Sequence, residues 1–144
     1  MSDPSFAIQD ALAIRLTGLL PEIGDRVYDD VPPEADRVRL HGAAWPYVSL
    51  GDGQIVPIDE TCGDRSTTFI DINVWSRAVG KVEVKKIAGA LRMALHEKPL
   101  DIVGHVLDGM TVESVNFMRD RDGKTHRARI ALSVDTQPAL PAAD

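Results

Sequence analysis

Two segments in which apolar and polar residues alternate constrain the fold more than any other feature of the sequence. The first stretch runs from Thr67 to Trp75 and has Ile70, Ile72 and Val74 on one face, and the second, from Ala128 to Val134, has an aliphatic side chain at every second position. A period of two is the pattern of a β-strand that has one face on the core. Phe69 and Trp75 fall on the opposite face of the first stretch, where a neighbouring subunit or a nearby loop would have to cover Trp75. The sequence therefore predicts a sheet with one buried face.

Two other segments have a helical period. Between Lys81 and His96 the apolar residues recur three and four positions apart and form a single stripe. An earlier helix is predicted to begin at Asp3-Pro4, because an acidic N-cap residue is followed by a proline suited to the first turn. Pro21 would end it. We expect these two helices to cover the sheet.

Short strands complete the predicted sheet. In one of them the apolar phase changes at Glu113-Ser114, which predicts a β-bulge, and Asp122-Gly123 predicts a two-residue hairpin turn. The fold class is thus α+β, with a mainly antiparallel one-faced sheet of about five strands covered by two helices. We expect a single domain over residues 1–135 and a flexible tail over residues 136–144. The predicted strands besides the two alternating segments are Arg26–Tyr28, Tyr47–Leu50, Ile102–Leu107 and Met110–Met118.

Residues 51–66 are predicted to form a long irregular loop, because turn-forming residues surround three aliphatic ones. Ile55, Val56 and Ile58 would then be exposed on the loop and dock against a partner, or the loop would fold back onto its own core. Together with Arg65 they are candidate interface residues.

No motif for catalysis or cofactor binding is present. A phosphate loop needs a glycine five positions before its Gly-Lys pair and a Ser or Thr after the lysine. The chain has Trp75 and Val82 at those positions. The four histidines and Cys62 have no zinc-ligand spacing. We therefore expect no enzyme, no cofactor and no metal, and the alternative enzyme class is a small hydrolase that pairs Cys62 with a histidine.

Charge is unevenly spread along the chain. The formal net charge is -6, and residues 1–36 hold eight acidic and two basic side chains, whereas residues 81–98 hold five basic and two acidic ones. This asymmetry suits self-association in which an acidic edge meets a basic face. The overall acidity disfavours general nucleic-acid binding. The single cysteine, and the lack of a basic segment before an apolar run or of a bilayer-length apolar stretch, predict a chain made in the cytoplasm without a membrane anchor.

The order of several short stretches resembles a known family. "PYV" is followed by "GD", then by "DINVWSR" and a helix that ends in "LH", and last by a hairpin containing "DRDG". In this order the chain resembles the tail-completion, or tail-terminator, family of long-tailed phages and gene transfer agents, over about residues 5–135.

The resemblance implies a structural virion protein rather than an enzyme. Such proteins form a homo-oligomeric ring, typically of about six subunits, which closes the tail tube and joins it to the head connector or stopper. Double-stranded DNA would pass through the lumen without specific binding, and the ring would assemble in the host cytoplasm. Trp75, Arg77, Lys81 and Lys85 are further candidate interface residues, the basic ones facing the acidic N-terminal third of a neighbour. A neck stopper or adaptor of the same particle is the alternative.

Overall fold

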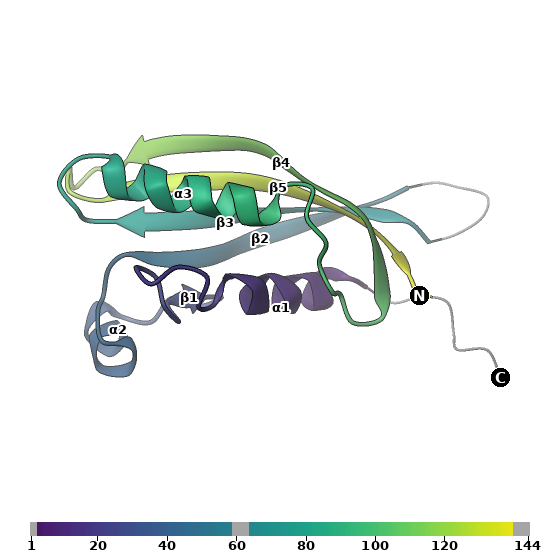
Figure 1. Cartoon of the computed structure of the whole chain (residues 1–144), viewed down its shortest axis with the longest axis horizontal. Helices are drawn as coiled ribbons and strands as arrows, with labels where there is room; N and C mark the ends of the chain where they lie inside the picture. The colour runs from purple at the N-terminus through teal and green to yellow at the C-terminus, as the bar shows by residue number, and fades with distance from the viewer. Residues whose placement is uncertain (1–2, 59–63, 140–144) are drawn as a thin grey trace.

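The computed structural model describes residues 3–58 and 64–139 and confirms the α+β class (Figure 1). One layer is a five-stranded sheet, and the other consists of helices on one of its faces. The elements follow one another as α1 (Ser5–Leu16), β1 (Val27–Tyr28), α2 (Glu34–His41), β2 (Tyr47–Pro57), β3 (Ser66–Ser76), α3 (Val82–Leu95), β4 (His105–Arg119) and β5 (His126–Pro138).

The sheet is mixed rather than purely antiparallel. Its strand order is β1-β2-β3-β5-β4, and every pair is antiparallel except β1 with β2, which is parallel and joins Val27 to Val48 and Tyr28 to Ser49. The predicted alternation places β3 and β5 side by side in the middle, with Ile72 opposite Ile130 and Val74 opposite Ala128. β2 lies on one side of this pair and β4, whose outer edge has no partner strand among the described residues, lies on the other.

The core lies between the sheet and the two helices α1 and α3. Ile72, Val74 and Ile130 are fully buried on the covered face of the sheet, as the alternation predicts. The helical stripes supply the opposite wall, with Leu12 from α1 and Leu91 from α3 in the same cluster. Burying such side chains removes apolar surface from water at about 25 cal/mol per Å², which makes this contact the main source of stability.

The prediction of a long loop over residues 51–66 is wrong for residues 51–57, which belong to β2, and residues 59–63 of that stretch lie outside the described residues. β2 continues to Pro57, and β3 begins at Ser66. The glycines that indicated a loop form a β-bulge, since the register shifts between Leu50 and Gly53. A Cβ on Gly51 would lie 3.0 Å from the backbone oxygen of Asp71 on β3, so glycine permits a close approach of two paired strands.

The helix predictions need two corrections. A third helix, α2, spans Glu34–His41, in a stretch where the sequence predicts no helix. α1 ends at Leu16 rather than before Pro21, because Gly18 adopts a φ of 76° and turns the chain. α3 begins one residue after its predicted start and ends one residue before its predicted end.

The C-terminal third is a single long hairpin. The two predicted strands at Ile102–Leu107 and Met110–Met118 are one strand, β4, with the predicted bulge between Val112 and Ser114. The hairpin with β5 is confirmed, but its turn is longer than two residues. Residues 136–138, predicted to belong to a flexible tail, pair with β4 in regular register.

Candidate functional site

The face of the sheet that the helices leave open carries a ladder of polar side chains. Arg129 donates from Nε and Nη2 to Asp71 Oδ2 at 2.9 Å, and Arg127 donates from Nε to Asn73 Oδ1 at 2.9 Å. Each of these bonds joins β5 to β3, and such cross-strand pairs stabilise a sheet. The charged groups of the open face are therefore engaged in contacts within the chain. A charged partner would have to break these contacts in order to bind there.

Aromatic rings and arginines gather at the end of the sheet where β2 begins and β3 ends. Trp75 stacks on Tyr47 with ring centroids 6.1 Å apart and donates from Nε1 to Ser49 Oγ at 2.9 Å. The Arg127 guanidinium lies 5.0 Å from the Trp75 ring centroid. Side chains of its own sheet thus half-bury Trp75, without the neighbouring subunit or loop that the sequence required. Burial raises the pKa of Tyr47.

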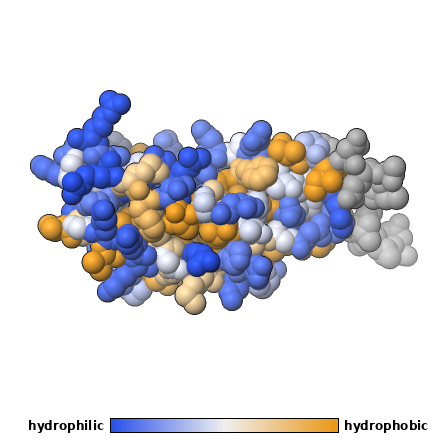
Figure 2. Space-filling model, turned by 90° about the horizontal axis from the view of Figure 1, so that it is seen from above, coloured by the Kyte–Doolittle hydropathy of each residue, from blue (hydrophilic) through white to orange (hydrophobic). Residues whose placement is uncertain are grey.

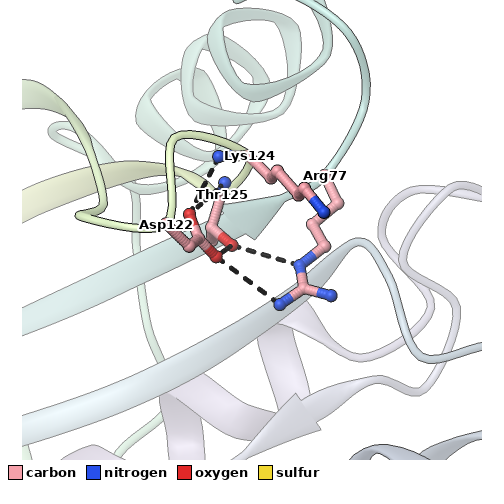
Figure 3. Close-up of polar contacts among 4 residues, drawn as sticks. All are labelled: Arg77, Asp122, Lys124 and Thr125. Atoms are coloured by element: carbon pink, nitrogen blue, oxygen red, sulfur yellow. Dashed lines mark hydrogen bonds and ion pairs between the residues drawn. The ribbon is translucent and has the colours of Figure 1, made fainter.

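Arg77 ties this end of β3 to the turn between β4 and β5 (Figure 3). Its Nε donates to Thr125 Oγ1 at 3.1 Å, its Nη2 lies 3.5 Å from Asp122 Oδ2, and its guanidinium carbon lies 4.6 Å from the Trp45 ring centroid. Asp122 Oδ1 also accepts hydrogen bonds from the backbone N–H groups of Thr125 and Lys124. These bonds, most of all those from Thr125, lower the pKa of Asp122 to about 2. The cluster is a turn-stabilising contact that connects segments 48 residues apart in the sequence.

The aliphatic candidates lie at the opposite end of the sheet, where β2 ends and β3 begins. Val56 is 41% exposed and Ile58 is 38% exposed, while Ile55 is half-buried. Phe69 of β3, which is paired next to this stretch, is 42% exposed. Arg65 is exposed, with its Nε 3.7 Å from Asp108 Oδ2. The strand geometry thus presents an apolar patch at this end, although not on the irregular loop that the sequence predicted.

One lysine candidate directly precedes α3 and the other lies on its first turn. Lys81 is the residue that precedes the helix, close to Arg77 in the chain. Lys85 lies one turn further on, and its Nζ is 5.3 Å from the ring centroid of Phe117 on β4. The eight predicted interface residues therefore form no single patch. They divide between the two ends of the sheet and the flank of α3.

The sequence reasoning missed several exposed apolar side chains. Phe6 and Ile14 of α1 are 78% and 70% exposed, and Val79 and Val82 beside the start of α3 are 103% and 64% exposed. For α1 the signal was present, because Phe6 and Ile14 lie eight positions apart on the face opposite the buried residues.

The described residues offer little for chemistry. No group of three or more His, Cys, Asp or Glu side chains within residues 3–58 and 64–139 could hold a metal ion. Cys62, the nucleophile of the alternative hydrolase, lies outside the described residues. His126 is buried, and His96 Nδ1 accepts a hydrogen bond from the backbone N–H of Val112. No helix among the described residues is long and apolar enough to cross a membrane.

Comparison with known proteins identifies the family. The chain matches the family described as tail completion protein gp17 over residues 7–136. It belongs to that family. The resemblance seen in the sequence is thereby confirmed, and the chain is a structural protein of a tailed virion. No curated protein sequence matches it.

Solved structures share the fold. A chain from the "Virion of native gene transfer agent (GTA) particle" matches with a TM-score of 0.81 and 24% identity, covering 95% of this chain and 99% of the other. A second solved chain matches with a TM-score of 0.54 and 14% identity, covering 99% of each. The fold of the tail completion protein therefore occurs, over nearly its whole length, in a gene transfer agent particle.

Proposed function

We propose that this tail completion protein forms a closed ring, of about six subunits, that ends the tail tube and joins it to the head connector. The observation that carries the proposal is the match to the tail completion family over residues 7–136. The gene transfer agent virion chain, with the same fold at a TM-score of 0.81, supports a place inside an assembled particle.

The positions of the two ends of the sheet support the proposal that each subunit binds one partner above the ring and a different one below it. They lie at opposite ends of the long axis in Figure 1, one where β2 ends and β3 begins and the other at the junction of β3 with α3. The first end exposes Val56 and Ile58 with Arg65, and the second exposes Val79 and Val82 beside Lys81. Exposed apolar side chains with a charged rim are typical of protein interfaces. We assign these ends to the tail tube and the connector.

Charge supports a lumen that DNA can traverse without specific binding. The arginines of the open face are engaged by Asp71 and Asn73, and the chain carries a net charge of -6. A protein that neutralises few phosphates releases few counterions and holds DNA weakly.

The test is to image the purified protein by negative-stain electron microscopy, alone and after addition of tail tubes that lack this protein. The expected result is a ring in solution or on the tube end, with tubes of uniform length. A chain that stays monomeric and does not bind the tubes would contradict the proposal. Rings that bind only purified connectors, and leave the tubes untouched, would instead assign the chain to the neck as a stopper or adaptor.

A further inference from the structure

A groove runs between α3 and β4 on the helix-covered side of the sheet. It has a volume of about 410 Å³ and is bounded by side chains of both elements. α1 packs over β1 and β2, and α3 packs over β3, β5 and part of β4, so the outer part of β4 lacks a covering helix in the described chain. Figure 2 views the molecule from above relative to Figure 1, toward the edge of the sheet that β4 forms, and shows apolar side chains gathered between hydrophilic ones. We name the α3–β4 groove by its residues Lys85, Gly89, Arg92, Val112, Val115 and Phe117.

The α3–β4 groove is lined by apolar side chains, with Lys85 and Arg92 on its α3 side and Glu113 on its β4 side. Glu113 Oε1 accepts a hydrogen bond from Ser133 Oγ at 2.7 Å. Val112 and Val115 are only partly buried, and Phe117 is 44% exposed. Lys85 and Arg92 stand two turns apart on α3, on the same flank of the helix. The two basic groups outnumber the single acidic one, so a partner that fits brings apolar side chains together with an acidic group that meets Lys85 and Arg92.

Gly89 leaves the backbone of α3 accessible in the groove. A glycine inside a helix costs about 1 kcal/mol relative to alanine. No neighbour among residues 3–58 and 64–139 requires it here, because Gly89 is exposed and a Cβ added to it would meet none of their atoms within 4 Å. Its position between Lys85 and Arg92 places this exposed backbone in the groove itself.

The outer face of α1 has the complementary chemistry. Phe6, Asp10 and Ile14 recur every four residues, all three are exposed, and they lie opposite the buried residues of the helix. Phe6 and Ile14 are about 12 Å apart along the axis at 1.5 Å per residue, and Lys85 and Arg92 are about 10 Å apart on the same measure. The apolar pair would reach the valines and Phe117, while Asp10 would meet the two basic side chains of the groove.

We infer that the α3–β4 groove of one subunit receives the outer face of α1 from the next subunit of the ring. The inference rests on the proposed ring and specifies how its subunits meet. Figure 1 places α1 and β4 on opposite sides of the molecule, so the contact joins two different patches head to tail. Such a heterologous contact closes into a ring when the rotation between subunits permits it.

Charge reversal tests the contact. Self-association is measured by sedimentation velocity, with or without tail tubes, in whichever condition the wild type forms rings. Asp10→Lys and Lys85→Asp should each weaken ring formation at least tenfold, because each places like charges together. The variant that carries both changes should form rings again, because at every interface the acidic and the basic side chain have then only exchanged places. The control is Arg39→Asp, at an exposed arginine of α2 that lines neither the α3–β4 groove nor the hollow beside Val79 and Val82, and it should leave ring formation unchanged.

The other results separate failure of this contact from failure of the ring. If both single variants form rings as readily as the wild type does, the proposed contact is wrong and the proposed ring is unaffected. Rings that persist while binding to tubes or connectors is lost would show that another protein occupies the groove, which also overturns the inference. A wild type that forms no ring in either condition would overturn both.

Discussion

Replacing Gly89 by alanine should make the isolated subunit more stable. The substitution replaces the residue with almost the lowest helix propensity by the one with the highest, a gain of about 1 kcal/mol in a helix interior. The structure adds no opposing cost, because the new Cβ meets no atom within 4 Å and Gly89 is not among the glycines with positive φ. Unfolding entropy of about 2.1 cal/mol/K per residue then converts the gain into a rise of about 3 °C in Tm for this chain.

The assay is thermal unfolding followed by circular dichroism at a concentration where the protein is monomeric, because assembly would raise Tm by mass action. Gly51→Ala is the matched control, since its Cβ would lie 3.0 Å from the backbone oxygen of Asp71 and should lower Tm instead. A Gly89→Ala variant that melts at or below the wild-type temperature would refute the reasoning. It would mean that the glycine serves the fold of the single subunit, and Gly89 would no longer support a contact between subunits.

Three further predictions concern other parts of the molecule. Ile72→Ala, at a fully buried position, should lower the free energy of unfolding by about 2–5 kcal/mol in urea titrations, and a loss below 1 kcal/mol would contradict its place in the core. Asp122 has a folded pKa of about 2 against an ordinary value of 3.8, so its stabilisation is present above pH 4 and is lost as the pH falls toward 2. The stability difference between wild type and Asp122→Asn should therefore shrink over that range in urea titrations, and a difference independent of pH would disprove it. Ile58→Asp should change the free energy of unfolding by no more than about 0.5 kcal/mol but abolish attachment to the tube or the connector. The control Gln54→Asp, also at an exposed position, should retain attachment. If both variants attach normally, this end of the sheet is not part of the interface.

The parts of the fold that could be predicted are those in which one local period decides the structure. The stripe of α3 and the alternation of β3 and β5 are such cases. α3 lies within one residue of its predicted bounds, while β3 and β5 contain the two alternating segments and β5 continues to Pro138, four residues past Val134. α2 was missed because its eight residues carry four charged side chains and only Arg37 is buried, so no apolar stripe marks it. The extension of β2 was missed because the glycines of a bulge have the same composition as a loop.

The candidate site was harder to predict because its geometry depends on contacts between distant segments. Arg77 looked free to meet another subunit, but Thr125 and Asp122 bind it across the end of the sheet. Trp75 looked exposed, but Tyr47 and Arg127 cover it from neighbouring strands. Both contacts exist only once the sheet order is fixed, and a single sequence does not reveal that order.

Exposed polar and exposed apolar side chains lie on different sides of the subunit in the proposed ring. On the open face the long polar side chains bond across strands, so docking there would break hydrogen bonds whose loss costs about 1–3 kcal/mol for each group left buried without a partner. Apolar side chains are exposed instead on α1, beside β4 and at the two ends of the sheet. If α1 and the α3–β4 groove join neighbouring subunits, both ends stay free for different partners. One small domain can then close a ring and still connect two other structures.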